Sequence, residues 1–89
     1  MKKEDIKIGQ RIVLTEEAET LYYGFKKSDF KAGMRGTVID TLPFNALIEF
    51  DDFINGHSGE KRGKRGHCWW FYKEDLIKIA KIYKRKNNY

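Results

Sequence analysis

The pattern of hydrophobic positions indicates a strand near the start of the chain, over residues 6–14. The apolar residues of one parity in this segment are Ile6, Ile8, Ile12 and Leu14. A period of two is typical of a strand with one buried face, and Gly9 offers a point at which the strand bends. We therefore expect these four side chains to face a common core.

Residues 15–34 show no hydrophobic period that lasts. Glutamates come first, an aromatic stretch follows at Leu21–Phe25, and lysines come last. No amphipathic stripe persists for three helical turns, so this segment is predicted to be a long, structured loop with aromatic anchors. Loops of this length in compact domains usually carry function.

Short β-prone segments separated by turn-forming residues occupy most of the remaining chain. Gly33–Asp40 is predicted to be a turn that leads into a strand, and Ala46–Phe50 a short strand. Glycine and asparagine make Asp51–Gly66 a turn-rich loop, after which His67–Tyr72 is strongly β-prone. Leu76–Ile79 is predicted to be the last strand.

These elements predict an all-β domain. Five short strands with a long first loop and tight later turns favour a small barrel over an open sheet. Before the last strand, Lys73–Asp75 has the length of one 3₁₀ turn. This order of elements resembles that of the SH3-like barrel over roughly residues 5–80. The domain is expected to span residues 1–83 and to be followed by a basic, flexible C-terminal tail at residues 84–89.

A second resemblance is local and covers about half of the chain. The residues that carry it are Gly36-Thr37-Val38, Ala46 to Asp51, Gly56-His57, Gly66 to Trp70, and Leu76. The pattern is similar to one in small phage and prophage proteins of uncharacterised function, and more distantly to the SH3-like repeats of mind-bomb-type ubiquitin ligases. This resemblance implies a barrel and a phage setting, and it transfers no catalytic residues.

Composition and charge narrow the class of protein. The 89 residues suffice for one domain, and 40% hydrophobic with 35% charged residues is typical of a globular chain. The net charge of +5 equals the charge of the C-terminal segment, whose charged side chains are Lys78, Lys81, Lys84, Arg85 and Lys86. Residues 1–77 are therefore balanced, and the body of the domain has no overall positive field.

The sequence favours a cytoplasmic protein, in the bacterial host if a phage encodes it. No stretch approaches the ~20 apolar residues of a membrane span, and the N-terminus lacks the apolar region of a signal peptide. We therefore expect no membrane partner. The single cysteine, Cys68, excludes an internal disulfide and favours a reducing compartment.

The strongest candidate for a binding site is a basic loop. Its cations are Lys61, Arg62, Lys64 and Arg65, with Gly63 between the two pairs. Arginine grips phosphate or carboxylate with two parallel hydrogen bonds, and the aromatic strand that follows offers a stacking surface. We expect a flexible, positive loop in contact with a ligand. The competing interpretation is a solvated loop that only keeps the protein soluble.

The aromatic part of the candidate site is assigned to Trp69, Tyr22 and Tyr23. Alternation along the strand places Trp69 and Trp70 on opposite faces. Because a small barrel buries only one face completely, one tryptophan is expected near the surface, and the sequence does not decide which. The two tyrosines of the first loop are expected to reach the same surface.

A metal site or a reactive thiol is the weaker hypothesis. His57, His67 and Cys68 are the soft metal ligands of the chain, whereas a structural zinc site needs four ligands, typically in two close pairs. A cysteine next to two tryptophans lies in apolar surroundings, which raise its pKa and suppress the thiolate. We therefore assign no catalytic residue, no metal and no cofactor.

The sequence as a whole favours a non-catalytic binding module, acting as a small accessory or inhibitory protein of a phage or mobile element. Its expected ligand is anionic: a nucleotide, a nucleic-acid backbone or an acidic protein surface. One alternative is a protein-interaction module that inhibits or adapts a host protein through its aromatic surface. Another is a small metal- or thiol-dependent enzyme. The oligomeric state is left open.

Overall fold

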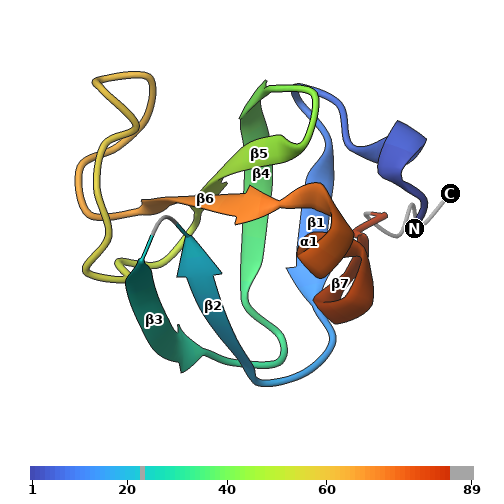
Figure 1. The fold of residues 1–89 in the computed structure, drawn as a ribbon, viewed down its shortest axis with the longest axis horizontal. Helices are drawn as coiled ribbons and strands as arrows, with labels where there is room; N and C mark the ends of the chain where they lie inside the picture. The colour runs from blue at the N-terminus through green and yellow to red at the C-terminus, as the bar shows by residue number, and fades with distance from the viewer. Residues whose placement is uncertain (23, 85–89) are drawn as a thin grey trace, which may run out of the picture.

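Strands dominate the structure, a computed structural model that describes residues 1–22 and 24–84, with the backbone alone at residues 20–22 and 25. Five strands form one antiparallel sheet in the order β6-β5-β4-β1-β7 (Figure 1). Their bounds are β1 (Arg11–Leu14), β4 (Arg35–Thr41), β5 (Asn45–Phe50), β6 (Cys68–Tyr72) and β7 (Ala80–Ile82). The all-β prediction is confirmed.

Closure of this sheet into a barrel stays a prediction. The sheet has β6 at one end and β7 at the other, and the pairings between the described strands do not join these ends. The resemblance to SH3-like barrels therefore remains an expectation from the order of elements. Of the predicted C-terminal tail, residues 85–89 lie outside the described part of the chain.

The long connection between β1 and β4 is present, and it is a β-hairpin rather than an irregular loop. Its strands are β2 (Ala18–Tyr22) and β3 (Phe25–Phe30), which pair antiparallel in a sheet of their own. Phe30 at the end of β3 is fully buried in the core. Ala18 on β2 also packs against the core, and the described contacts of the hairpin with the core follow no regular alternation, in line with the missing periodic signal over residues 15–34.

The strand predicted over residues 6–14 begins only at β1. The chain before it forms a 3₁₀ turn, η1 (Lys3–Asp5), and then a turn at Gly9, whose φ is 91°. Because this turn interrupts the alternation, Ile8 is 65% exposed and its predicted place in the core is wrong. The other apolar residues of that parity are buried, as predicted: Ile6, Ile12 and Leu14.

A short helix, α1 (Lys73–Ile79), precedes the last strand and replaces the predicted single 3₁₀ turn. It takes up Leu76–Ile79, which the sequence pattern assigned to a strand. Leu76 is fully buried, and Glu74 and Asp75 lie in the first turn, where acidic side chains favour a helix. The last strand is therefore β7, which follows the helix directly.

The core lies on one face of the main sheet. Phe30, Phe50 and Phe71 form its centre, with ring centroids 5.4, 5.1 and 5.9 Å apart. Alternation along β5 turns Ile48 and Phe50 toward this core and Leu47 toward the opposite side, which we call the outer face. Since Leu47 is also fully buried, another part of the chain must cover the outer face at this point.

Candidate functional site

The loop between β5 and β6, residues 51–67, covers one end of the outer face and forms a large excursion in Figure 1. A Cβ atom on Gly59 would lie 2.5 Å from Leu47 Cδ2, and one on Gly63 would lie 2.6 Å from Cys68 Sγ. Only glycine allows the loop to approach the sheet so closely, because interiors are close-packed. The predicted basic site therefore lies on a loop that is packed against the sheet.

Hydrogen bonds fix the backbone of the basic loop, Lys61–Gly66, in contrast to the flexible loop that the sequence predicts. The Lys64 amide donates to Glu49 Oε2 on β5 (2.8 Å), and the Lys61 amide donates to Ser58 Oγ (3.1 Å). The Cys68 thiol also donates a hydrogen bond to the Lys64 carbonyl (3.5 Å). These partners lie on both the sheet and the preceding turn, so the cations of the loop project from a held backbone.

All four predicted cations are exposed, and ion pairing sets Lys61, Lys64 and Arg65 apart from Arg62. Within the described part of the chain, no carboxylate lies within ion-pair distance of these three side chains. Their charges are therefore not neutralised by a close partner. They are the part of the predicted site that has no ion-pair partner among the described residues.

The fourth cation, Arg62, is engaged in contacts within the protein. Its Nε lies 3.2 Å from Asp40 Oδ2 on β4, and its guanidinium carbon lies 5.8 Å from the centroid of the Trp70 ring. A longer ion pair of 3.7 Å joins Arg62 to Glu60. Ion pairing and cation–π contact together connect the loop to the sheet. Arg62 is therefore a supporting residue more than a ligand-binding one.

Trp69 lies on the other face of β6, away from the cations of the basic loop. It packs against the core, with its ring 5.5 Å from that of His57 and 5.7 Å from Lys27 Nζ. The Lys27 side chain is only 9% exposed, and its ammonium pairs with Asp29 (2.8 Å). Both tryptophans are partly exposed, and Trp70 is the one that contacts the basic loop. Strand parity separates the two rings but does not tell which face the loop covers.

The tyrosines of the predicted site are at the tip of the hairpin. Tyr22 ends β2 and its backbone pairs with Phe25 of β3, while Tyr23 lies outside the described residues. The hairpin lies beside β6 (Figure 1), the strand that carries Trp69. A contribution of Tyr22 and Tyr23 to the site therefore stays a prediction.

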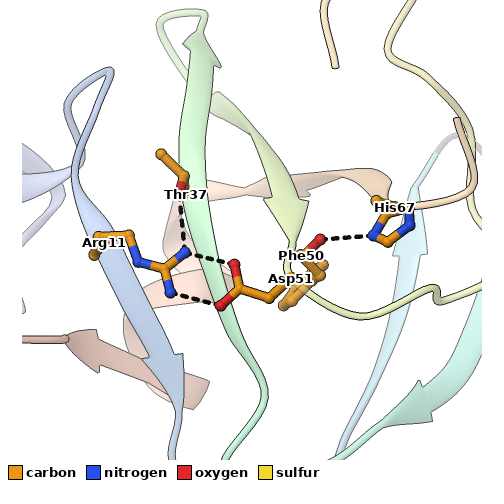
Figure 2. A network of polar contacts seen from close by, with 5 residues as sticks. All are labelled: Arg11, Thr37, Phe50, Asp51 and His67. Atoms are coloured by element: carbon orange, nitrogen blue, oxygen red, sulfur yellow. Dashed lines mark hydrogen bonds and ion pairs between the residues drawn. The ribbon is translucent and has the colours of Figure 1, made fainter. Parts of the chain in front are cut away.

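The histidines and the cysteine each have a local partner. His57 Nδ1 accepts a hydrogen bond from the Gly59 amide (2.8 Å), and His67 Nδ1 donates to the Phe50 carbonyl (2.9 Å; Figure 2). Burial raises the pKa of the Cys68 thiol, which disfavours the thiolate. Among the residues that the structure describes, no three metal-ligating side chains come together. The described contacts give these residues structural roles around the loop.

A second charged group lies at the other end of the sheet, and sequence reasoning missed it. Figure 2 shows Arg11 on β1 donating through both terminal nitrogens to the Asp51 carboxylate (2.6 Å each) and to Thr37 Oγ1 on β4 (3.0 Å). These hydrogen bonds are the main reason that the pKa of Asp51 is lowered. The pair is not visible in the sequence, because residues 11 and 51 meet only through strand pairing.

Comparison with known protein families, with curated proteins and with solved structures finds no match for this chain. In the part of the chain that the structure describes, no helix is long and apolar enough to cross a membrane. Function therefore has to be inferred from the surfaces of the molecule itself.

Proposed function

We propose that this protein is a non-catalytic binding module that recognises an anionic ligand through the exposed cations of the basic loop. One observation carries the proposal: Lys61, Lys64 and Arg65 are exposed on a loop whose backbone is hydrogen-bonded to the sheet and to its own turn. A held cluster of like charges binds an anion with less loss of conformational entropy than a mobile one.

The local charge balance supports an anionic ligand. Asp40 and Glu60 both pair with Arg62, and Glu49 accepts a hydrogen bond from the Lys64 amide. The four loop cations outnumber these three carboxylates by one. A positive surface raises both the local concentration and the association rate of anions. Phosphate and carboxylate groups both fit, so a nucleotide, a nucleic-acid backbone or an acidic protein surface meets the requirement.

The aromatic contribution to the proposed site comes from Trp70. This ring lies beneath Arg62, on the face of β6 that the loop covers, and it is partly exposed. Trp69, assigned to the site from the sequence, lies on the opposite face. A ligand held by the loop cations would therefore meet Trp70 and Arg62 before it meets Trp69.

The biological setting in this proposal is a phage or mobile element, with an accessory or inhibitory role in the host cytoplasm. This setting rests on the sequence resemblance alone. The ligand class is independent of it, because the class follows from the charge and position of Lys61, Lys64 and Arg65.

A rival function is supported by one exposed aromatic residue near the base of the loop. Phe53 is 67% exposed, and its ring centroid lies 5.9 Å from that of His67. An exposed phenylalanine beside a histidine ring fits a protein partner that binds through aromatic contacts. In that case the protein would act as an interaction module, and the basic loop would contribute little to affinity.

Retention on heparin at increasing salt tests the anionic-ligand proposal. The variant carries alanine at Lys61, Lys64 and Arg65. We expect it to elute at clearly lower salt than wild type, because each lost contact to an anionic group reduces the number of counterions released on binding. Thermal unfolding of the variant checks that its fold is unchanged.

The matched control removes three exposed cations elsewhere, at Lys2, Lys7 and Lys31. This control has the same net charge as the loop variant, so only the position of the charges differs. If the two variants elute together, retention follows net charge and the proposal fails. Capture of a host protein that withstands high salt and is lost in Phe53→Ala would support the rival function instead.

A further inference from the structure

The outer face of the sheet is open at the end opposite the basic loop, where a hollow lies along β1, β4 and β7. This hollow has a volume of about 470 Å³, and its lining includes Arg35, Lys81, Tyr83 and Lys84. Val13 on β1 pairs with Arg35 on one side and with Lys81 on the other, so the two cations belong to the same face. None of the residues assigned to the basic loop lines this hollow.

Arg35 is held in the hollow without the use of its hydrogen-bond donors. Its guanidinium carbon lies 4.5 Å from the centroid of the Tyr83 ring, which is a cation–π contact. Such a contact uses the flat face of the guanidinium, whereas its N–H donors radiate in the plane. Among the described residues, the Arg35 side chain has no hydrogen bond or ion pair, so these donors are available to a ligand.

Arg11 lies near the same ring but is already satisfied. It is 5.9 Å from the Tyr83 centroid, and its terminal nitrogens bind Asp51 and Thr37 (Figure 2). Arg11 and Asp51 neutralise each other, and this leaves the donors of Arg35 without a competing carboxylate at hydrogen-bond distance.

The charges around the hollow favour an anion with more than one negative charge. Arg35, Lys81 and Lys84 are all exposed and carry three positive charges. A smaller adjoining hollow of about 300 Å³ shares Arg35 and is lined by Asp51 and Asp52. With Asp51 neutralised by its arginine, Asp52 is the one acid there that opposes the three cations among the described lining residues.

We infer that this hollow is a second anion site, separate from the basic loop, which takes the phosphate groups of a small molecule such as a phosphomonoester or diphosphate. Arg35 supplies the paired donors that match two phosphate oxygens, and Lys81 and Lys84 supply point charges. Tyr83 holds the guanidinium in place before the ligand arrives. The volume falls in the range of small-molecule sites, about 300–1,000 Å³.

Titration of nitrogen-15-labelled protein with inorganic pyrophosphate, at constant ionic strength, tests this inference. We expect saturable shifts of the Arg35 Nε–H signal and of the amide signals of Lys81 and Lys84. The same titration is run on the variant with alanine at Lys61, Lys64 and Arg65. Unchanged binding in that variant is expected, and it separates failure of the basic-loop site from failure of this one.

Variants of Arg35 and Tyr83 test the geometry rather than the charge. Arg35→Lys keeps the charge but loses the paired donors, and it should weaken pyrophosphate binding about tenfold. Tyr83→Leu keeps every cation but removes the ring beneath Arg35, and it should weaken binding about threefold. The matched control is Tyr83→Phe, which retains the ring and should bind like wild type.

Equal affinity in Arg35→Lys and wild type would overturn the inference. So would shifts that do not saturate and that are as large at exposed lysines elsewhere, such as Lys7, which would mean adventitious binding of an ion only. A short oligonucleotide distinguishes the source of the phosphate. If it binds in an Arg35-dependent way while pyrophosphate does not, the small-molecule assignment is wrong.

Discussion

The two ends of the outer sheet face use the same kinds of side chain in different ways. At the end covered by the loop, Arg62 lies over Trp70 and pairs with Asp40. At the open end, Arg35 lies over Tyr83, and its donors have no partner among the described residues. An arginine over an aromatic ring is thus part of a structural contact in one place and of a candidate binding site in the other.

The loop that covers one end accounts for this difference. Where Gly63 brings the chain onto the sheet, Arg62 comes within reach of Asp40 and Trp70 and finds its partners within the protein. At the open end, water can satisfy the Arg35 guanidinium until a ligand replaces it. The composition of a charged cluster therefore does not decide whether it binds a ligand, because what covers the cluster decides it.

The largest expected effect comes from Gly63→Ala, which pushes the loop away from the covered end. The new methyl group would lie 2.6 Å from both Cys68 Sγ and Ile39 Cδ1. We expect the free energy of unfolding to fall by about 1–3 kcal/mol, as at other overpacked sites. Urea denaturation followed by circular dichroism measures the change.

The variant Cys68→Ala shows whether this loss comes from the predicted clash. Combined with Gly63→Ala, it removes the sulfur atom that the methyl group would meet. The double variant should therefore lose less stability than the sum of the two single losses. Strictly additive losses would mean that the loop does not press on Cys68. Pyrophosphate binding at Arg35 should be the same in all of these variants.

Strand positions could be predicted wherever apolar residues alternate or run on without interruption. Ile12 and Leu14 in β1 and the apolar run of β5 are in the core or beneath the loop, as their pattern indicates. The pattern was misleading at Ile8, because the turn at Gly9 breaks the alternation. It was also misleading over Leu76–Ile79, because a run of four apolar and basic residues suits a helix as well as a strand.

The charged residues of the candidate site could be predicted from the sequence, but the ion pairs that they form could not. The run of cations from Lys61 to Arg65 is visible in the sequence. That Arg62 pairs with Asp40, and that Arg11 pairs with Asp51, depends on strand register and on the side of the sheet that the loop covers. Contacts over such sequence separations have no local signal. A sequence therefore shows which charges are present, and the fold decides which of them are neutralised.

A smaller effect should separate Arg62 from Arg65, two arginines of the same loop. Arg62→Ala removes both the ion pair with Asp40 and the contact with Trp70, and it should cost about 1 kcal/mol of stability. Arg65→Ala makes the same change in charge at a position with no ion pair among the described residues, and its effect should stay within about 0.5 kcal/mol. Denaturation curves under one buffer give both values. Equal losses would show that Arg62 is not a structural contact.

The covered end should loosen in mild acid, and the open end should not. Burial lowers the pKa of His57, whose Nδ1 accepts a hydrogen bond from the Gly59 amide. Because the pKa of His57 is lower in the folded protein than its ordinary value of 6.5, the neutral imidazole stabilises the fold above pH 6.5. This stabilisation is lost as the pH falls through the folded-state pKa of His57.

Amide signals around Gly59 should therefore shift or broaden as the pH falls below 6.5, the ordinary histidine value. Signals around Arg35 should stay unchanged over the same range. The variant His57→Asn retains a hydrogen-bond acceptor that does not titrate, so the pH dependence around Gly59 should disappear. If this variant responds to pH as wild type does, another group controls the loop.

The smallest expected effect concerns the open end in stronger acid. Hydrogen bonds from Arg11 lower the pKa of Asp51, so this carboxylate stabilises the fold above its ordinary value of 3.8. The contribution is lost as pH falls through the lower folded-state pKa. Because the two side chains are 36% and 49% exposed, solvent screens the pair and the effect should be slight.

Asp51→Asn should therefore flatten the fall in stability below about pH 4, as measured by thermal unfolding at a series of pH values. Asp52→Asn is the matched control, since Asp52 is exposed and forms no ion pair within the described part of the chain. If both variants flatten the curve equally, the pairing with Arg11 is not its source. The Asp51 carboxylate would then be free to approach Arg35. The contrast between Arg11, whose donors are paired, and Arg35, whose donors are open to a ligand, would no longer hold.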